Sequence, residues 1–483
     1  MQKSEKYANG DSYDGEFLNG EKHGKGEFKW ADGDQYNGDW KNDKRTGRGK
    51  YKWANGDSYD GEFLNGEKHG KGEFKWADGD QYNGDWKNDK RTGRGKYKWA
   101  NGNSYDGEFL NGEKHGKGKY KWANGNSYDG EFLNDEKHGK GEFKWADGDQ
   151  YNGDWKNDKR TGRGKYKWAN GDSYDGEFLN GEKHGKGEFK WADGDQYNGD
   201  WKNDKRTGRG KYKWANGDSY DGEFLNGEKH GKGEFKWADG DQYNGDWKND
   251  KRTGRGKYKW ANGDSYDGEF LNGEKHGKGE FKWADGDQYN GDWKNDKRTG
   301  RGKYKWANGD SYDGEFLNGE KHGKGEFKWA DGDQYNGDWK NDKRTGRGKY
   351  KWANGNSYDG EFLNGEKHGK GEFKWADGDQ YNGDWKNDKR TGRGQQKWAD
   401  GNSYDGEFLN DEKHGKGEYK WVSGSIYYGD WKNDNRTGRG QQKWADGSKY
   451  DGDWVNGKRH GQGEFQSAKG EKYNGKWVFD EKM

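Results

Sequence analysis

The sequence predicts an all-β fold: an elongated, single-layer antiparallel array of β-hairpins with about 42 short strands. Three observations predict it. A tyrosine recurs every 23 residues from Tyr13 to Tyr473, so the chain holds 21 copies of one unit. Within each unit, aromatic residues and glycines alternate with charged residues at the two-residue period of strands. Most units also carry Asn-Gly or Asn-Asp near their centre, a strong signal for a hairpin turn.

Two versions of the unit alternate along the chain. Unit A, residues 13–35, reads YDGEFLNGEKHGKGEFKWADGDQ, and unit B, residues 36–58, reads YNGDWKNDKRTGRGKYKWANGDS. The alternation slips once, because the unit at Tyr105 begins as A but ends like B, and the unit at Tyr128 is A again. We expect one continuous repeat domain, with an incomplete unit at 1–12, seventeen near-identical units at 13–403, and four diverged units with a cap at 404–483.

The alternation assigns one face of each hairpin to packing. In the first unit, this face carries Tyr13, Gly15, Phe17, Gly24, Gly26, Phe28 and Trp30. Because the three glycines have no side chain, we expect neighbouring rings to lie flat on the backbone there. The charged residues between these positions belong to the opposite face.

Two kinds of turn connect the expected strands. Asn19-Gly20 joins the two strands of unit A, and Asn42-Asp43 joins those of unit B. Asn, Asp and Gly tolerate the positive φ angles of a type I′ turn. Asp32-Gly33 and Asn55-Gly56 supply the turns between units. The chain is therefore expected to run as a continuous meander.

The composition requires an aromatic core. Only 24% of the residues are hydrophobic and 37% are charged, values typical of disordered chains, yet Trp, Tyr and Phe make up 17%. The net charge of +1 supplies no overall field that would attract nucleic acid, so no nucleic-acid partner is expected. The absence of cysteine excludes disulfides and thiol chemistry, and no stretch resembles a signal peptide or a transmembrane segment. A cytoplasmic protein is expected.

No catalytic, metal-binding or cofactor-binding set of residues is apparent. Each of the eleven histidines belongs to an A unit. Consecutive A units lie two hairpins apart, so their histidines are expected about 19 Å from each other, too far to share a metal. We expect a protein without cofactors and without enzymatic activity.

The motif Tyr-x-Gly-x-Trp/Phe, an Asn-Gly or Asn-Asp turn, and then His-Gly-x-Gly-x-Phe resembles the MORN (membrane occupation and recognition nexus) repeat. The resemblance covers the chain from Tyr13 onward; the B units depart from it at Arg45-Thr46, and the last unit, from Tyr473, lacks the Gly-x-Gly element. It implies a scaffold or adaptor, at the cytoskeleton or at the periphery of a membrane in some relatives. Lipid-headgroup binding and dimerisation through terminal repeats are implied as further properties.

Charge alternates between the two units. Unit A carries six acids and three bases, for a net charge of −3, and unit B carries three acids and six bases, for +3. Such bands stabilise neighbouring strands through cross-strand pairs. They also predict a protein partner or self-association with a stagger of 23 residues, in which bands of opposite charge meet.

A second function follows from the bases themselves. The candidate phosphate-binding or partner-binding residues of unit B are Lys41, Lys44, Arg45, Arg48, Lys50 and Lys52. Together with Leu18 and its copies beside the hairpin tips, they predict binding to phosphoinositides at a membrane surface as the alternative to protein binding.

The last four units contain every Val and Ile of the chain. The candidate end-docking residues are Val422, Ile426, Val455, Val478 and Phe479. Solenoid ends need modified units, so these residues are expected either to cap the array or to form a docking site at its end.

The repeat number predicts the length of the molecule. With about 9.6 Å for each two-stranded unit, the 21 units should give a contour of about 200 Å before twist shortens it. Small-angle X-ray scattering measures the maximum dimension directly. A value below half of that contour would contradict the elongated array.

Overall fold

A computed structural model describes residues 1–483, which form 43 β-strands and no helix. The expected all-β class and the expected number of about 42 strands are confirmed. The chain divides into two compact units: unit 1 comprises residues 1–238 and 248–250, and unit 2 comprises residues 239–247 and 251–483.

The strands alternate between seven and nine residues along the repeats. Unit 1 contains β1 Gln2–Lys6, β2 Ser12–Leu18, β3 Glu21–Lys29, β4 Gln35–Lys41, β5 Lys44–Lys52, β6 Ser58–Leu64, β7 Glu67–Lys75, β8 Gln81–Lys87, β9 Lys90–Lys98, β10 Ser104–Leu110, β11 Glu113–Lys121, β12 Ser127–Leu133, β13 Glu136–Lys144, β14 Gln150–Lys156, β15 Lys159–Lys167, β16 Ser173–Leu179, β17 Glu182–Lys190, β18 Gln196–Lys202, β19 Lys205–Lys213, β20 Ser219–Leu225 and β21 Glu228–Lys236.

The residues of β22 Gln242–Lys248 are divided between the two units. Unit 2 contains β23 Lys251–Lys259, β24 Ser265–Leu271, β25 Glu274–Lys282, β26 Gln288–Lys294, β27 Lys297–Lys305, β28 Ser311–Leu317, β29 Glu320–Lys328, β30 Gln334–Lys340, β31 Lys343–Lys351, β32 Ser357–Leu363, β33 Glu366–Lys374, β34 Gln380–Lys386, β35 Lys389–Lys397, β36 Ser403–Leu409, β37 Glu412–Lys420, β38 Ile426–Lys432, β39 Asn435–Lys443, β40 Lys449–Val455, β41 Lys458–Gln466, β42 Lys472–Val478 and β43 Glu481–Lys482.

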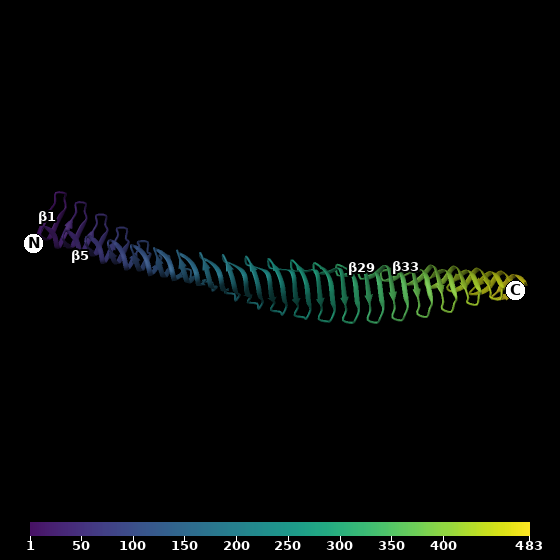
Figure 1. Cartoon of the computed structure of the whole chain (residues 1–483). Helices are drawn as coiled ribbons and strands as arrows, with labels where there is room; N and C mark the ends of the chain where they lie inside the picture. The colour runs from purple at the N-terminus through teal and green to yellow at the C-terminus, as the bar shows by residue number, and fades with distance from the viewer. The chain divides into compact units, whose positions relative to one another are not determined.

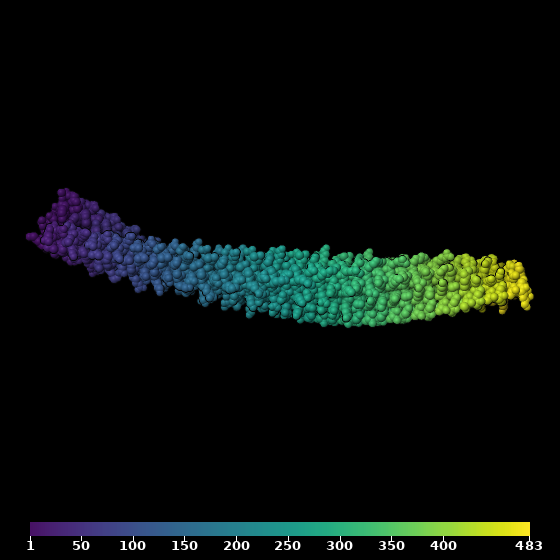
Figure 2. Space-filling model, viewed as in Figure 1, coloured from purple at the N-terminus to yellow at the C-terminus, as the bar shows by residue number.

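Within each of the two compact units, every strand pairs antiparallel with the strands before and after it in the chain, so the strands form a meander (Figure 1). The ladders keep equivalent residues opposite each other: Tyr13 faces Phe28, and Phe28 faces Tyr36 on the next strand. The space-filling view shows that, within each compact unit, each segment of the chain borders the segments that precede and follow it (Figure 2). Each hairpin therefore finds its packing partners in the hairpins next to it.

The hairpin turns adopt the expected backbone conformation. Asn19 and Gly20 have φ angles of 52° and 90°, and Asn42 and Asp43 have 50° and 64°. Both central residues thus lie at positive φ, as a type I′ turn requires. The predicted turns in units A and B are confirmed.

Each hairpin contains a bulge that the sequence alternation did not reveal. The register shifts after Gly15, so that Glu16 faces His23 while Gly15 faces Gly26. Gly24 lies inside this bulge at φ 60°, and a Cβ there would overlap the Glu16 carboxylate. The expectation that a ring covers Gly24 is therefore wrong: this glycine supplies the left-handed backbone of the bulge.

The ring of the repeat tyrosine covers the other two glycines. A Cβ on either Gly15 or Gly26 would overlap the Tyr13 side chain, whose hydroxyl donates a hydrogen bond to the Glu16 carbonyl oxygen at 3.1 Å. Tyr13 and its copy Tyr36 are fully buried. The prediction of rings lying on strand glycines is confirmed at these two positions.

Aromatic rings of neighbouring repeats pack against each other. The Tyr36 ring meets Trp40 of its own unit and Phe63 of the next edge-on, with centroids 5.1 and 5.2 Å apart. The Trp40 indole donates a hydrogen bond to the Gly26 carbonyl oxygen of the preceding unit at 3.1 Å. Trp30, which is half-buried, stacks between Phe28 and Tyr51. Every unit thus completes the core of its neighbour.

Two cations cover the aromatic side of the hairpins. The Lys22 ammonium lies 5.5 Å from the Phe28 centroid, and the Arg45 guanidinium lies 4.8 Å from the Tyr51 centroid. Arg45 also donates a hydrogen bond to the Gly66 carbonyl oxygen of the next unit at 2.7 Å. These side chains shield a core that a single sheet leaves open on one side.

The glycine–tyrosine contact is testable at Gly72, which is covered by the Tyr59 ring. Gly72→Ala should destabilise the surrounding hairpins by at least about 1–3 kcal/mol, because the ring must leave its position. Amide hydrogen exchange in β6 and β7 measures the effect. Gly66→Ala is the matched control: it lies at φ 91° with no atom near its Cβ, so only a backbone cost of about 1 kcal/mol applies. Equal effects of the two substitutions would contradict the tight ring contact.

Candidate functional site

The polar face of the sheet, opposite the aromatic side, carries its side chains in rows that cross the strands. The ladders align Glu27, Asn37, Lys50 and Asp60 in one row. They align Lys29, Gln35, Lys52 and Ser58 in the row beside it. We call these the mixed row and the lysine row. In the regular units, the lysine row holds one base per unit and no acid.

Ion pairs connect acidic units to basic ones. Lys22 of unit A pairs with Asp43 of unit B at 2.9 Å, and Lys50 of unit B pairs with Asp60 of the next A unit at 3.0 Å. Lys25 likewise pairs with Asp39 at 2.5 Å. Exposed pairs of this kind contribute about 0.2–1 kcal/mol each. Many charges of the predicted bands are thus already paired between neighbouring repeats.

In the regular B unit, two bases that line the polar face away from the hairpin tip are left free; in the last B unit Arg439, the counterpart of Arg48, pairs with Asp451 at 3.7 Å. Arg48 and Lys52 are exposed and form no ion pair, and the side chain of Arg48 makes no hydrogen bond. Asp39 accepts a hydrogen bond from the Arg48 backbone amide at 3.0 Å, so its carboxylate is directed to the bulge. The B unit therefore exposes an unpaired guanidinium and an unpaired ammonium on the same strand, four residues apart.

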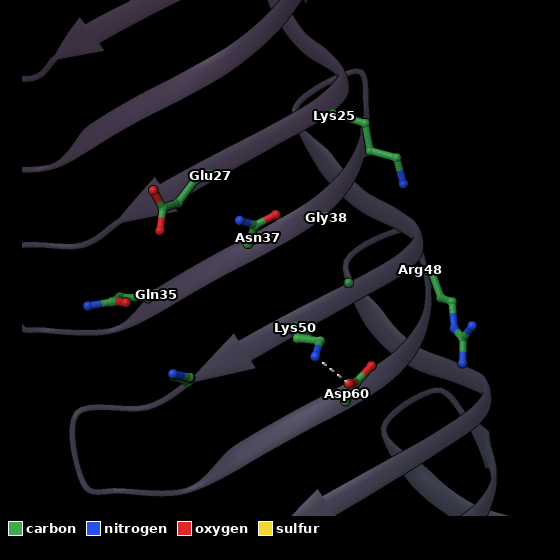
Figure 3. A pocket seen from close by; sticks show the side chains of 10 residues that line it. Lys25, Glu27, Gln35, Asn37, Gly38, Arg48, Lys50 and Asp60 are labelled. Carbon is green, nitrogen blue, oxygen red and sulfur yellow. Dashed lines mark ion pairs between the residues drawn. The ribbon is translucent and has the colours of Figure 1, made fainter.

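These bases line a groove of about 670 Å³ that spans β3 to β6. Figure 3 shows Lys25 and Arg48 at one end of the groove, with Glu27, Asn37 and Lys50 along its floor and the Lys50–Asp60 ion pair across it. Two further grooves lie around Arg94 and Arg163, with volumes of about 770 and 500 Å³; they share the counterparts of Lys25, Asn37, Arg48, Lys50 and Asp60, but the counterpart of Lys52 lines neither. The repeat thus produces a periodic series of polar grooves.

The structure separates the six predicted bases of unit B. It brings Arg48, Lys50 and Lys52 together in the groove, and it places Lys41 and Lys44 at the hairpin tip. Arg45 points to the aromatic side and leaves the set, because it covers Tyr51 and binds the next unit. Arg45 lies an even number of residues from Gly47, Gly49 and Tyr51 in the sequence, and this spacing could have predicted its position on the aromatic side.

The hairpin tips carry both exposed leucines and charged side chains. Leu18 is 52% exposed, and its copies in the other A units are exposed as well. At the B tips, a hydrogen bond from the Lys22 backbone amide, together with the Lys22 ammonium, holds the pKa of the Asp43 carboxyl below its usual range. That acid fastens the tip of unit B to unit A.

The histidines are enclosed by their own hairpins. The imidazole Nδ1 atom is buried without a hydrogen-bond partner in ten of the eleven, beginning with His23. No group of three or more His, Asp or Glu side chains is arranged to hold a metal ion. The structure also contains no helix capable of spanning a membrane.

The five predicted end-docking residues do not form one patch. Val422, 71% exposed, lies in the turn between β37 and β38, and Ile426 lies half-buried on the polar face. Val455 and Val478 end their strands at hairpin tips, and Phe479 packs against the His460 ring, with centroids 4.7 Å apart. Among the five, Ile426 alone lines a groove.

Tyr428, which was not among the predicted site residues, is 55% exposed in that groove. The signal was present, because Tyr428 stands where every other B unit has Asn after its repeat tyrosine. The groove has a volume of about 530 Å³ and is also lined by Gln441 and Asp451.

Comparisons with known proteins identify the repeat. The family model for the MORN repeat matches 20 consecutive segments that cover residues 13–472. The predicted number was 21; the unmatched last unit has only the two-residue strand β43 in place of a second strand. No curated protein matches the chain.

Similarities to solved structures are remote. The chain is 14% identical to the TCP domain of Drosophila melanogaster SAS-4 in complex with a proline-rich motif of Ana2, over 41% of this chain and 88% of that one, with a TM-score of 0.18. The TCP10 domain of Danio rerio CPAP is 9% identical, over 55% and 98%, with a TM-score of 0.12. Virginiamycin B lyase from Staphylococcus aureus is 10% identical, over 58% and 89%, with a TM-score of 0.11. Scores this low support no argument about fold or function.

Because the repeat tyrosines are buried, the fold is expected to lose stability at alkaline pH. Burial raises the pKa of Tyr13 from 10.0 to about 12 and raises that of Tyr36 further. Because the folded pKa lies above the unfolded value, this stability is complete below pH 10 and is lost as the pH rises through the folded pKa. We expect steep cooperative unfolding above pH 10, followed by circular dichroism and tyrosinate absorbance. The chain unfolded in denaturant should titrate near 10; the same midpoint in the folded protein would contradict the prediction.

Proposed function

Because the chain belongs to the MORN-repeat family, we propose that it is a non-enzymatic scaffold or adaptor that holds protein partners at fixed intervals along its repeats. The binding positions are the polar grooves of the B units. MORN repeats are generally non-catalytic, and the proposal assigns this chain no reaction. Its expected location is the cytoplasm, at the cytoskeleton or at the surface of a membrane.

One observation supports the proposal above the others: an exposed arginine without an ion pair recurs in the grooves, as Arg48, Arg94 and Arg163. An acidic group of a partner finds these bases without having to break an ion pair. Equivalent B units along the alternating stretch recur every 46 residues, so one partner type meets the same chemistry repeatedly. Several weak contacts then add up through effective concentration.

The proposal is tested by two variants with the same change in charge. The first replaces the free arginines by Gln at positions Arg48, Arg94, Arg163, Arg209, Arg255, Arg301, Arg347 and Arg393. The matched control replaces paired lysines by Gln at Lys25, Lys71, Lys140, Lys186, Lys278, Lys324, Lys370 and Lys416. Affinity capture from the native cell, read by mass spectrometry, should lose its specific proteins with the arginine variant and keep them with the control. An identical protein set for wild type and arginine variant would overturn the proposal.

The exposed leucines at the A tips favour peripheral membrane binding as a second candidate. Leu18 and its copies lie beside tips whose B neighbours carry Lys41 and Lys44, a combination that suits an anionic lipid surface. Flotation with phosphoinositide vesicles at physiological salt tests it. Co-migration that disappears when the tip leucines are replaced by Ser would support this function, and absence of co-migration would remove it.

A further inference from the structure

The polar face is most basic where the alternation of units slips. The repeat at 82–104 carries six bases and two acids, and the repeat at 105–127 carries four bases and three acids. No other two consecutive repeats both have a positive net charge. We call β9 to β12, residues 90–133, the slip region.

One substitution removes an acid from the polar face of β11. Lys119 stands where the regular A units have glutamate, as at Glu27 in Figure 3. In a regular A unit this glutamate pairs with the lysine two residues later, as Glu73 does with Lys75 at 3.2 Å. Lys121 occupies the second position in the slip region, where it has no such glutamate beside it and forms no ion pair.

A second lysine of β11 loses its partner for a different reason. In the regular stretch, the lysine at this position pairs with an aspartate of the following B unit, as Lys71 does with Asp85. An A unit follows β11 instead, and β12 places Glu131 opposite Lys117. The Glu131 carboxylate lies in its own bulge, where it would overlap a Cβ at Gly139. Lys117 therefore forms no ion pair.

Arg94 of β9 is unpaired in the same way as its counterpart Arg48. It faces Glu108 in the ladder, but the Glu108 carboxylate lies in the bulge, where it would overlap a Cβ at Gly116. The Arg94 side chain forms no ion pair and no hydrogen bond. Arg94 and Lys117 both line the groove of about 770 Å³.

Four unpaired and exposed bases thus lie on two strands that have one strand between them. Arg94 and Lys98 belong to β9, and Lys117 and Lys121 belong to β11. Lys98 and Lys121 are level, because both face Ser104 of β10. Arg94 and Lys117 are also level, because each precedes a glycine of one ladder row. The matching pair of strands in the regular stretch keeps two such bases, both on the B strand.

The hairpin tip of the slip region is adapted to the slip, whereas the polar face is not. Asp135 stands where most A units have glycine. It pairs with Lys114 at 2.9 Å and accepts a hydrogen bond from the Lys114 backbone amide, also at 2.9 Å. Asp43 makes the same contacts with Lys22 in the regular stretch. The junction is therefore compensated at the tip, while the bases of the polar face remain available to a partner outside the chain.

We propose that the slip region binds one partner protein through an acidic segment in extended conformation that lies over β10. Side chains four residues apart in such a segment lie on the same side, about 13 Å from each other. Arg94 and Lys98 are also four residues apart, and so are Lys117 and Lys121. Each acid of the segment then lies between one base of β9 and one of β11, strands that are about 9.6 Å apart.

The centre of the slip region determines the residue midway between the two acids. Lys96 pairs with Asp106 at 3.1 Å, and Lys119 pairs with Asp129 at 2.8 Å, so the charges between the four free bases are already balanced. The midway residue lies over Asp106, where a third acid would meet a carboxylate. The segment that fits best therefore carries acid, neutral residue and acid at alternate positions.

The same pattern favours a protein segment over nucleic acid. A nucleic-acid backbone carries a charge on every nucleotide, so it cannot leave the position over Asp106 neutral. No exposed aromatic ring lies in the slip region, so bases find no surface on which to stack.

This inference rests on the proposed scaffold function and adds to it a position that occurs once. Equal repeats present equal grooves, so they cannot fix where along the array a partner binds. A site made by the slip gives one partner a defined place, from which the regular grooves follow at fixed intervals.

The chain contains no cysteine, which permits a fluorophore to be attached at one chosen position. One chain carries Ser127→Cys on β12, beside Lys121, and a second carries Gln196→Cys at the matching place on β18, beside Lys190. The probe is the dabcyl-labelled peptide Thr-Glu-Thr-Asn-Thr-Glu-Thr, which quenches the fluorophore where it binds. At low salt, half-quenching at position 127 should need an at least about fivefold lower peptide concentration than at position 196, because two further bases are free there.

Matched variants and a matched peptide make the result specific. Lys119→Glu restores the regular residue and should raise the half-quenching concentration at position 127 to that at position 196. Lys165→Glu makes the same change in charge in a regular unit and should leave position 127 unchanged. The peptide Thr-Thr-Glu-Thr-Glu-Asn-Thr has the same composition with its acids two residues apart, and it should bind several-fold more weakly.

Three results would overturn the inference: equal quenching at the two positions, no effect of Lys119→Glu, or tighter binding of a dabcyl-labelled oligothymidylate than of the peptide at position 127. The proposed function fails separately, since it is overturned by an unchanged set of captured proteins in the arginine variant. Peptide binding at position 127 does not depend on that result.

Discussion

The seating of each repeat tyrosine on a pair of strand glycines is the contact on which the rest of the structure depends. The Tyr13 ring occupies the space that Cβ atoms at Gly15 and Gly26 would need, so the ring packs directly on the backbone of two strands. This contact brings Trp40 of the next hairpin within reach of the Gly26 carbonyl oxygen. A sheet with very few aliphatic residues thereby obtains a packed interior from rings, each shared between neighbouring hairpins.

The bulge in each hairpin is the second determinant of the architecture. Gly24 and its copies adopt positive φ there, and the acid at the fourth position, Glu16 in unit A and Asp39 in unit B, accepts a backbone hydrogen bond across the bulge. In unit B, the second oxygen of this carboxylate pairs with Lys25 of the preceding unit. The Arg48 backbone amide and the Lys25 ammonium thus occupy both oxygens of Asp39, and the Arg48 guanidinium forms no ion pair, although unit B carries three acids. Backbone geometry thus determines which charges remain available to a partner.

Near-identical repeats make small departures informative. A solenoid of equal units presents equal surfaces, so a site that occurs once must come from substitutions that break the pattern. Tyr428 breaks it on the polar face, while Gln396 and Gln442 break it inside the core, where each accepts a hydrogen bond from an arginine at 2.9 Å. The buried glutamines replace the ring contacts that Tyr51 makes elsewhere with a hydrogen bond to an arginine, and the exposed tyrosine alters the surface. The two kinds of departure therefore have different consequences.

The sequence by itself determined the period, the strands, the hairpin turns and the packing face, because these depend on local alternation and on residues that tolerate positive φ. It also identified Tyr13, Gly15 and Gly26 as a packing set. It did not determine the bulge at Gly24, the position of Arg45 over Tyr51, or the freedom of Arg48. Those features were decided by the tertiary structure, because each depends on which atoms of a neighbouring strand or unit lie opposite. Alternation gives the side of the sheet on which a residue lies, whereas only the ladder register gives its partner.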